Sequence, residues 1–357
     1  MHLRNARTVL VWIVLLPFLA SSFSSQSSTS LRRAGEAAHV LIGTAVRADQ
    51  LTEENYARTL AAEYDLAEPE DAMKWWVLRP ARDSFDFRQG DAIVRFAQMH
   101  GMKVRGHCLL WGNNNPEWLT QGNFSAEELS RLAEQHIETV VRHYAGQVFA
   151  WDVVNEGLDE NGDPRQTIWN RGTAGGIRED RLGYMEQAFR WARAADPNAL
   201  LFYNEAEAEG LGRKSDAVYS MLKDFRGRGV PVDGVGLQMH IFNLKLDADA
   251  VTANIARLIA LGLQVHITEL DVEVPVDENG NPRDSTALQS QAAIYAAVVR
   301  SCRQNPGCTA IQTWGFTDKY SWIGSHSHHT QGAALPFDRN YQKKAAYDAI
   351  LRALQDK

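Results

Sequence analysis

The chain has 357 residues, of which 45% are hydrophobic and 23% are charged. This is the composition of an ordinary globular protein with enough length for a sizeable core. Its formal net charge of −7 argues against nucleic acid or an anionic membrane surface as a partner, because either would favour a basic stripe.

The N-terminus has the features of a secretory signal peptide. A basic start, MHLRNAR, precedes a short apolar run from Thr8 to Ala20, and SSFSSQSSTS follows. The apolar run is shorter than the roughly 20 residues of a membrane span, so an uncleaved anchor is the weaker alternative. We therefore expect a signal peptide over residues 1–25, a flexible stub over 26–38 and one folded domain over 39–357. The mature protein would be secreted, extracellular or periplasmic, and free of the membrane.

Short apolar runs then alternate with longer amphipathic runs. The amphipathic ones, such as 91–101, 125–146 and 248–262, predict helices, and Ser125 with Glu128 predicts a capping box in the second. The predicted strands are HVLIGTAV (39–46), YDLAEPE (64–70), KVRGHCLLW (103–111), VFAWDVVNE (148–156), ALLFYNE (199–205), GVGLQMHI (234–241), QVHITELDV (264–272) and AIQTWGFTD (310–318).

Eight strands separated by helices indicate parallel βα units. Their nearly continuous apolarity indicates that both faces of the sheet are covered. We expect an α/β fold, a single (β/α)8 TIM barrel. An open doubly wound sheet is the alternative, but the phosphate-binding motifs GxGxxG and GxxxxGK[ST] are absent from the sequence.

Polar and aromatic side chains gather toward the ends of six of these strands. In an α/β barrel the C-terminal strand ends form the rim of the active site. Because side chains alternate along a strand, a histidine on one strand could lie beside two carboxylates on the next and keep one of them ionised. The side chains are His107 and Trp111, Asn155 and Glu156, Tyr203 to Glu205, Gln238 and His240, Glu269 and Asp271, and Trp314 with Trp322 after it.

Two glutamates at the ends of different strands suit the hydrolysis of a glycosidic bond. One carboxyl group must protonate the leaving oxygen, and the other must attack or activate water. The ten tryptophans fit a sugar ligand, because aromatic faces stack on sugar rings. A solvated carboxylate would explain either glutamate alone, whereas the joint pattern with histidine and tryptophan favours the hydrolytic chemistry.

The chain resembles the glycoside hydrolase family 10 endo-β-1,4-xylanases. The likeness extends from IGTAV (42–46) to AAYDAI (345–350), and its strongest parts are MKW (73–75), MKVRGHCLLW (102–111), WDVVNE (151–156), DGVGLQMH (233–240), ITELD (267–271) and TWGFTDKYSW (313–322). It implies a monomeric enzyme that hydrolyses internal bonds of the polysaccharide xylan with retention of configuration. No cofactor and no metal would be needed.

The resemblance also implies roles for individual residues. Glu156 would be the general acid and base, and Glu269 the nucleophile, which His240 and Asp271 would tune. Asn155 would bind the 2-hydroxyl group of the sugar at the cleavage point. The other substrate-binding residues would be Glu70, Asp71, Lys74, His107, Trp111, Tyr203, Gln238, Trp314 and Trp322.

Export would place the three cysteines in an oxidising compartment, where disulfides can form. Cys302 and Cys308 flank the turn sequence NPG (305–307), which a bridge could cross, and the resemblance implies that they form a disulfide. Cys108 lies inside an apolar run, so we expect a buried and unreactive thiol.

Three positions depart from the family pattern. Gly112 stands where histidine is usual, Asp71 where asparagine is usual and Ile323 where arginine is usual. Both glutamates are untouched, so the reaction class is unaffected. The departures leave open a related retaining β-1,4-glycanase that acts on another plant cell-wall polysaccharide.

Parts of the sequence are also compatible with two other classes of protein. The SHSHH segment (325–329) could indicate a metal-dependent barrel hydrolase, although a solvated loop is the simpler interpretation and the first strand lacks an HxH pair. A catalytically inactive carbohydrate-binding barrel is disfavoured by the presence of both glutamates.

Three remaining features predict structure rather than chemistry. His266 alternates away from Glu269 and should be structural. LDENGDPR (158–165) resembles part of a calcium loop but lacks EF-hand spacing, so we expect a turn. The acidic residues in 205–209 should form a solvated loop.

Overall fold

The structure is a computed structural model that describes residues 29–170 and 182–356. The predicted signal peptide lies outside the described residues. Within these two ranges, every helix is too short or too polar to cross a membrane.

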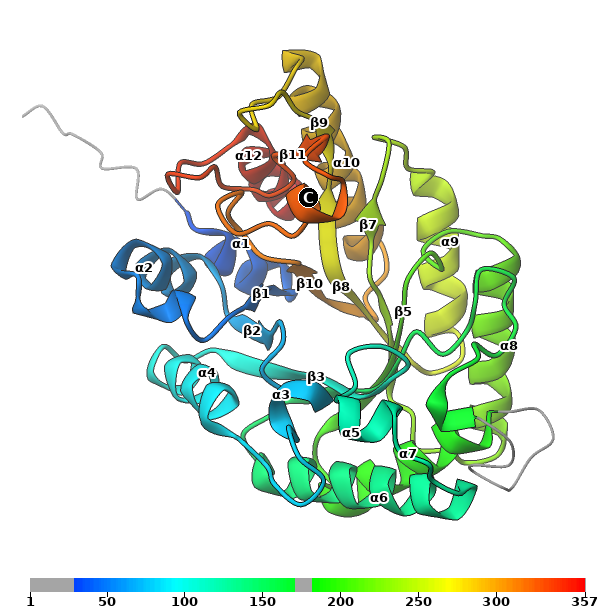
Figure 1. Cartoon of the computed structure of the whole chain (residues 1–357). Helices are drawn as coiled ribbons and strands as arrows, with labels where there is room; N and C mark the ends of the chain where they lie inside the picture. The colour runs from blue at the N-terminus through cyan, green and yellow to red at the C-terminus, as the bar shows by residue number, and fades with distance from the viewer. Residues whose placement is uncertain (1–28, 171–181, 357) are drawn as a thin grey trace, which may run out of the picture.

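Eight parallel strands close into a ring, and helices surround it (Figure 1). Closure is made by the first and last strands of the ring, where Leu41 of β1 lies opposite Ala310 of β10. The predicted (β/α)8 barrel is confirmed, and the open sheet is excluded. The ring consists of β1 (Leu41–Val46), β2 (Leu66–Pro69), β3 (Lys103–Trp111), β4 (Ala150–Asn155), β5 (Leu200–Glu205), β6 (Gly234–Leu237), β8 (Gln264–Val272) and β10 (Cys308–Thr313).

Two of the predicted strands end well before the sequence suggested. The run 234–241 is split into β6 and the two-residue β7 (His240–Ile241), because Met239 has a left-handed backbone with φ of 68°. The run 310–318 ends as a strand at Thr313, before Gly315 turns the chain with φ of 86°. Two further short strands, β9 (Val274–Pro275) and β11 (Gln331–Gly332), pair with each other outside the ring.

The main helices follow the predicted pattern. The Ser125 hydroxyl accepts a hydrogen bond from the Glu128 amide, and the Glu128 carboxylate accepts one from the Ser125 amide, so the capping box is confirmed. The longer helices are α1 (Leu31–Ala38), α2 (Glu54–Glu63), α4 (Arg88–Met99), α6 (Ala126–His143), α7 (Gly183–Ala195), α8 (Arg213–Gly227), α9 (Ala248–Ile259), α10 (Ser285–Arg303) and α12 (Ala345–Gln355), and the short ones are η1 (Gln50–Thr52), α3 (Trp75–Leu78), α5 (Glu117–Thr120), η2 (Ile168–Asn170) and α11 (Ile323–His326).

Helix α1 corrects the expectation of a flexible stub over 26–38. Ser30 caps this helix by accepting a hydrogen bond from the Arg33 amide. Leu31 is buried, and its amide donates to Glu63 at 2.9 Å. From Leu31 onward this segment is therefore part of the packed domain, because apolar contacts and a buried hydrogen bond hold it to α2.

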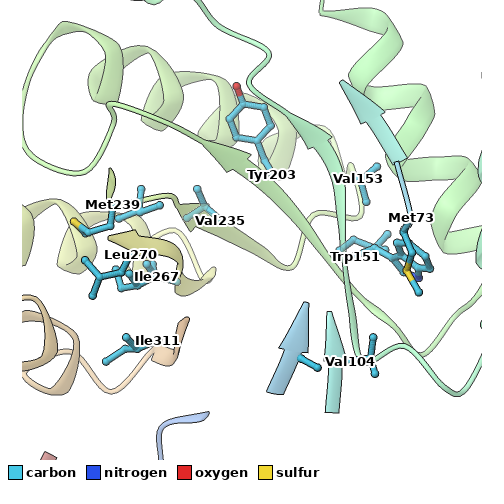
Figure 2. Close-up of a cluster of buried hydrophobic side chains, with 14 of the residues drawn as sticks. Met73, Val104, Trp151, Val153, Tyr203, Val235, Met239, Ile267, Leu270 and Ile311 are labelled. Atoms are coloured by element: carbon cyan, nitrogen blue, oxygen red, sulfur yellow. The ribbon is translucent and has the colours of Figure 1, made fainter. Parts of the chain in front are cut away.

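Apolar side chains fill the space around the barrel wall. Figure 2 shows part of this cluster, with Val104 of β3, Trp151 of β4, Val235 of β6 and Ile267 of β8. Trp151 is fully buried and lies across Gly106, where a Cβ atom would be 2.2 Å from the indole ring. Glycine on β3 thus makes room for the tryptophan of the neighbouring strand.

The inside of the barrel contains a buried polar network, which the strand pattern did not predict. Arg105 pairs with Asp152 on the next strand, and neither side chain is exposed. His266 Nδ1 lies 2.8 Å from Arg105 Nη1, and its Nε2 lies 3.0 Å from Thr309 Oγ1. His266 is therefore held by internal hydrogen bonds, in keeping with the structural role expected for it.

Three loops share one geometry built on an aspartate. In the first, Asp159 Oδ1 accepts from the amides of Asn161 at 2.9 Å and Asp163 at 3.0 Å. The turn expected over 158–165 is therefore present. Asp277 and Asp338 make the same pair of bonds with the residues two and four positions later.

Candidate active site

Glu156 directly follows β4, and Glu269 lies near the end of β8, so both carboxylates belong to the same rim of the barrel. The backbone of Glu156 has a φ of 52°, a left-handed conformation that is uncommon for residues other than glycine. Its amide donates to the carbonyl oxygen of Asn204 at 2.9 Å. The chain thus leaves the strand abruptly at Glu156, and the neighbouring strand holds that conformation in place.

Three side-chain amides connect the two glutamates. Asn155 Oδ1 accepts from Asn204 Nδ2 at 2.9 Å and from Gln238 Nε2 at 3.2 Å. Asn204 Nδ2 also lies 2.7 Å from Glu269 Oε1, and Gln238 Nε2 lies 3.1 Å from Glu156 Oε1. The relative position of the two carboxyl groups is therefore fixed by the protein alone.

The β-sheet register explains this arrangement. Asn155 of β4 lies opposite Asn204 of β5, which brings the two amides together. Asn204 in turn lies opposite Gly236 of β6, where a Cβ atom would be 2.1 Å from Asn204 Oδ1. Glycine at this position gives the Asn204 side chain the space to reach Glu269.

His240 lies between two carboxylates, as the alternation of side chains predicted. Its Nδ1 is 2.9 Å from Asp271 Oδ1, and its Nε2 is 3.2 Å from Glu269 Oε2. His240 and Asp271 are opposite each other in the pairing of β7 with β8. Trp322 Nε1 donates to the second oxygen of Asp271 at 2.7 Å, so the carboxylate is held from two sides.

These contacts determine which groups carry charge. Burial lowers the pKa of His240, but the charge and hydrogen bond of Asp271 outweigh burial and hold this pKa well above its ordinary value. Burial raises the pKa of Glu269, yet the hydrogen bond from His240 and the charges of His107 and His240 bring it below its ordinary value. Glu269 is therefore ionised next to two imidazolium groups.

A second buried group supports the site from inside the barrel. His107 is 1% exposed, and its Nδ1 lies 2.9 Å from Asp152 Oδ2 and 3.4 Å from Glu68 Oε1. Burial, together with the charge of Asp152, raises the pKa of Glu68 to about 8. Burial lowers the pKa of His107, but the adjacent Cys108 together with Asp152 and Glu269 holds it well above the ordinary value.

Within the described residues, Glu68, His107 and Glu269 are the one group of three potential metal ligands whose donor atoms converge within 4.8 Å. An imidazolium ring has no free lone pair for a metal, so the raised pKa of His107 favours charge pairing over metal binding here. The histidines of the 325–329 segment are not part of this group. His326 instead packs against Trp322, with ring centroids 4.6 Å apart.

The residues expected to bind substrate on the other side of the rim lie close together. Lys74 Nζ is 5.2 Å from the centre of the Trp111 ring and 5.4 Å from that of Trp314. It also lies 3.3 Å from Asp71 Oδ1. Burial and the charge of Asp71 raise the pKa of Glu70 to about 7. Two aromatic rings, a cation and two carboxyl groups thus share this part of the site.

Tyr203, like His107, was expected to bind substrate but is buried. Its side chain is fully buried, its hydroxyl group donates to Glu205, and it accepts from the Gly157 amide at 3.1 Å. It does not line the cleft. It supports the backbone just after Glu156, because the side chain points under the strand end rather than out of it.

Glu205 also differs from expectation. The sequence predicted a solvated carboxylate, but Glu205 is fully buried and pairs with Lys214 at 3.0 Å. The Leu158 amide donates to its other oxygen at 3.1 Å. The partner is nine residues away on α8, so the sequence pattern alone did not show that this charge is neutralised. Glu207, in contrast, is exposed as predicted.

The three departures from the family pattern have local explanations. At Gly112 a Cβ atom would lie 2.7 Å from Thr167 Cγ2, so this loop position has room only for glycine. The extra charge of Asp71 is balanced by Lys74 and by Arg47, whose Nη1 lies 3.9 Å away. Ile323 is fully buried at the start of α11 and presents no side chain to the rim.

Three residues of the site had no role assigned from the sequence: Asn204, Glu68 and Asp152. Asn204 was visible as a polar residue at a strand end. Glu68 and Asp152 were visible as charges inside apolar strands, which require a buried partner. That signal could have indicated the polar network behind His107.

Residues 30–353 match the family model described as "Glycosyl hydrolase family 10". The chain is 38% identical to endo-1,4-beta-xylanase B of Thermotoga neapolitana, with 97% of each chain covered. It is also 38% identical to endo-1,4-beta-xylanase D of Talaromyces funiculosus, with 94% of this chain and 80% of the relative covered.

Solved structures agree in fold. Xylanase 10B from Thermotoga petrophila RKU-1 in complex with xylobiose has a TM-score of 0.86 at 39% identity, covering 92% of this chain and 97% of that chain. Native xylanase 10B from Thermotoga maritima has a TM-score of 0.85 at 39% identity, covering 92% and 98%.

Proposed function

The chain belongs to glycosyl hydrolase family 10, and we propose that it is a secreted endo-β-1,4-xylanase that cleaves internal bonds of xylan with retention of configuration. The observation that carries the proposal is the pair of rim carboxylates, Glu156 and Glu269, which hydrogen bonds through side-chain amides connect. The relatives of this chain are named endo-1,4-beta-xylanases.

We assign the nucleophile to Glu269. Its carboxylate is ionised because the hydrogen bond from His240 and two nearby positive charges offset the cost of burial. In the first step Glu269 attacks the anomeric carbon and forms a covalent bond to the sugar. The C–O bond to the leaving sugar breaks as this bond forms.

We assign the acid and base roles to Glu156. It protonates the oxygen of the leaving sugar in the first step and so becomes a carboxylate. In the second step it accepts a proton from water, whose oxygen replaces Glu269 at the anomeric carbon. Each carboxyl group ends in its starting state, and the two displacements together give retention.

The surrounding residues would position the sugar chain. Asn155 would donate its amide to the 2-hydroxyl group at the cleavage point, since its oxygen is already occupied by two amide donors. Trp111 and Trp314 would provide stacking faces. Lys74 and Asp71 would form hydrogen bonds with the next sugar away from the cleavage point, and Glu70 lies beside them in the chain.

Product analysis on purified polysaccharides tests this function. We expect the wild-type enzyme to release short oligosaccharides from xylan, and to do so unchanged after chelation with EDTA. Glu269→Ala should release none, while Glu278→Ala, which changes an exposed loop glutamate, should match the wild type. Undiminished release by Glu269→Ala would contradict the assignment. Greater activity on cellulose or mixed-linkage glucan than on xylan would favour the alternative β-1,4-glycanase.

Secretion and oligomeric state are separate parts of the proposal. The basic and apolar N-terminal segment supports export, and we expect the exported chain to begin near residue 25. Sequencing the N-terminus of the exported protein tests this. Size-exclusion chromatography with light scattering should give the mass of a monomer.

A further inference from the structure

A hollow adjoins the candidate active site on the side of Asp71. Its volume is about 790 Å³, and it is lined by the segment before η1, by α3 and by the start of α4. These elements lie beside β2 and β3 in Figure 1. Asp71 lines the hollow and also contacts Lys74, so the two spaces share a wall.

The most unusual residue of the hollow is Trp76 on α3. It is 47% exposed, whereas its neighbour Trp75 is 2% exposed. The indole Nε1 of Trp75 donates a hydrogen bond to the Leu109 carbonyl oxygen at 2.5 Å. The Trp75 ring also stacks on the His136 ring, with the ring centroids 3.7 Å apart. With Trp75 anchored, the helical turn directs Trp76 outward into the hollow.

An exposed tryptophan that lines a hollow beside polar side chains is a candidate binding surface. Four large apolar side chains in the described residues are exposed, and Trp76 is one of them. None of the predicted substrate-binding residues requires it, because Trp111 and Trp314 already provide the aromatic faces next to Lys74. Trp76 is therefore available to a ligand other than the sugars bound at the cleavage point.

The charges around Trp76 define the chemistry of that ligand. Arg47 Nε lies 3.3 Å from Asp49 Oδ1, and Arg47 Nη1 lies 3.9 Å from Asp71 Oδ2. Arg88 Nη2 lies 2.5 Å from Asp86 Oδ2. The hollow thus has three carboxylates and two guanidinium groups, with no excess of positive charge to attract an anion. Paired acceptors and donors beside an aromatic face suit the hydroxyl groups and the apolar face of a neutral sugar ring.

We propose that this hollow is a further sugar-binding subsite, in which Trp76 stacks against a xylan unit beyond the one bound by Asp71 and Lys74. The proposal rests on the proposed function of the enzyme. Asp71 links the two spaces, since its carboxylate faces Lys74 on one side and Arg47 on the other. A substrate chain long enough to pass Asp71 would reach Trp76, and a short chain would not.

Chain-length dependence tests the proposal. The value of kcat/KM should be measured on xylo-oligosaccharides of increasing length for the wild type and for Trp76→Ala. We expect Trp76→Ala to lower kcat/KM about tenfold on the longest substrates, a loss of about 1.4 kcal/mol, and to leave the shortest cleavable substrate unchanged. Trp76→Phe should retain part of the effect, because it keeps an aromatic face.

Met99→Ala is the matched control, because Met99 is 75% exposed on α4 and does not line the hollow. It should leave every value unchanged. Equal losses at all lengths, or no loss at any length, would overturn the subsite. If the wild type cleaves none of these substrates, the proposed function fails, and calorimetric titration of the wild type and Trp76→Ala with the longest oligosaccharide still decides whether Trp76 binds it.

Discussion

His240 Nδ1 lies 2.9 Å from Asp271 Oδ1, on the strand next to its own. This contact keeps His240 protonated, and the charged ring lowers the pKa of Glu269. In Asp271→Asn the pKa of His240 should fall, and the pKa of Glu269 should therefore rise. The acidic limb of the kcat/KM profile should move to higher pH by about one unit.

The direction of this shift follows from the protonation state in which Glu269 is active. Because ionised Glu269 is the attacking group, a higher pKa removes activity at the acidic end and leaves the neutral range less affected. Asp249→Asn, which changes an exposed residue on α9, is the control and should keep the wild-type profile. An unmoved acidic limb in Asp271→Asn would contradict the link between Asp271 and Glu269.

The stereochemistry of rescue by azide should separate the roles of the two glutamates. In Glu269→Ala, azide can replace the missing nucleophile in a single displacement and give a product of inverted configuration. In Glu156→Ala, azide should attack the covalent intermediate and give a product of retained configuration. Both variants should lose at least about 10³-fold in kcat/KM without azide.

Nuclear magnetic resonance of the anomeric proton reads out these configurations. An activated aryl xylobioside is the suitable substrate, because its leaving group needs little protonation. Azide products of the same configuration from both variants would refute the division of roles.

Asn204 should position Glu269 rather than react itself. Asn204→Ala removes the donor 2.7 Å from Glu269 Oε1 and leaves Asn155 Oδ1 with one partner fewer. We expect kcat to fall about 10²-fold, with a loss of about 1–3 kcal/mol in the free energy of unfolding from unpaired buried groups.

Asn204→Asp distinguishes positioning from a loss of stability alone. The added carboxylate would lie beside Glu269 and raise its pKa, so the acidic limb should shift upward further in this variant than in Asn204→Ala, which only removes a hydrogen-bond donor. If both variants lose stability while kcat and the pH profile stay at wild-type values, Asn204 has only a structural role.

The disulfide between Cys302 and Cys308 is present, as the resemblance implied, and Cys108 is a buried free thiol. Replacing both bridged cysteines with serine opens a loop with a sequence separation of 6. The chain-entropy relation gives a loss of about 2 kcal/mol for so short a loop, which lowers the melting temperature by about 3 °C for a domain of this size.

Differential scanning calorimetry measures this change. Reduction of the wild type should produce the same decrease, whereas the serine variant should not respond to a reductant. A larger decrease for the variant than for the reduced wild type would indicate that serine at these buried positions adds its own cost.

Gly112 and Thr167 should be energetically coupled. Gly112→Ala places a Cβ atom 2.7 Å from Thr167 Cγ2 and should cost about 1–2 kcal/mol in the free energy of unfolding. Thr167→Ser removes the clashing methyl group but keeps the hydroxyl that accepts from the Trp169 amide. A double-mutant cycle by urea unfolding should therefore show that Thr167→Ser recovers most of the cost of Gly112→Ala. Strictly additive losses would exclude the steric explanation.

Much of the fold could be predicted because strands covered on both faces are apolar throughout and the intervening helices are amphipathic. KVRGHCLLW and QVHITELDV were placed without error as β3 and β8. The break at Met239 was not predicted, because a positive φ at a non-glycine residue leaves no sequence signal. The ordered helix α1 was missed because a Ser-rich segment dominated the interpretation of the residues before it.

The sequence likewise placed some residues of the site correctly and others not. His240, Asp271 and Glu269 could be brought together from alternation along two strands. Tyr203 and Glu205 could not be placed, since their burial depends on Lys214 and on the loop after Glu156, which are separate in sequence. Local periodicity shows which face a side chain occupies, but not how deep in the barrel its partner lies.

The ring of strands has a consequence for how activity returns after unfolding. Glu156 directly follows β4 and Glu269 lies on β8, with β5 and β6 between them, and the Thr313 hydroxyl of the last strand donates a hydrogen bond to that of Thr44 on the first. A fragment that stops before β8 lacks one carboxylate, and one that starts after β4 lacks the other. Two such fragments regain turnover only by reassembling the ring. The activity restored in a fragment-complementation assay would therefore measure the fraction of molecules in which the barrel is complete.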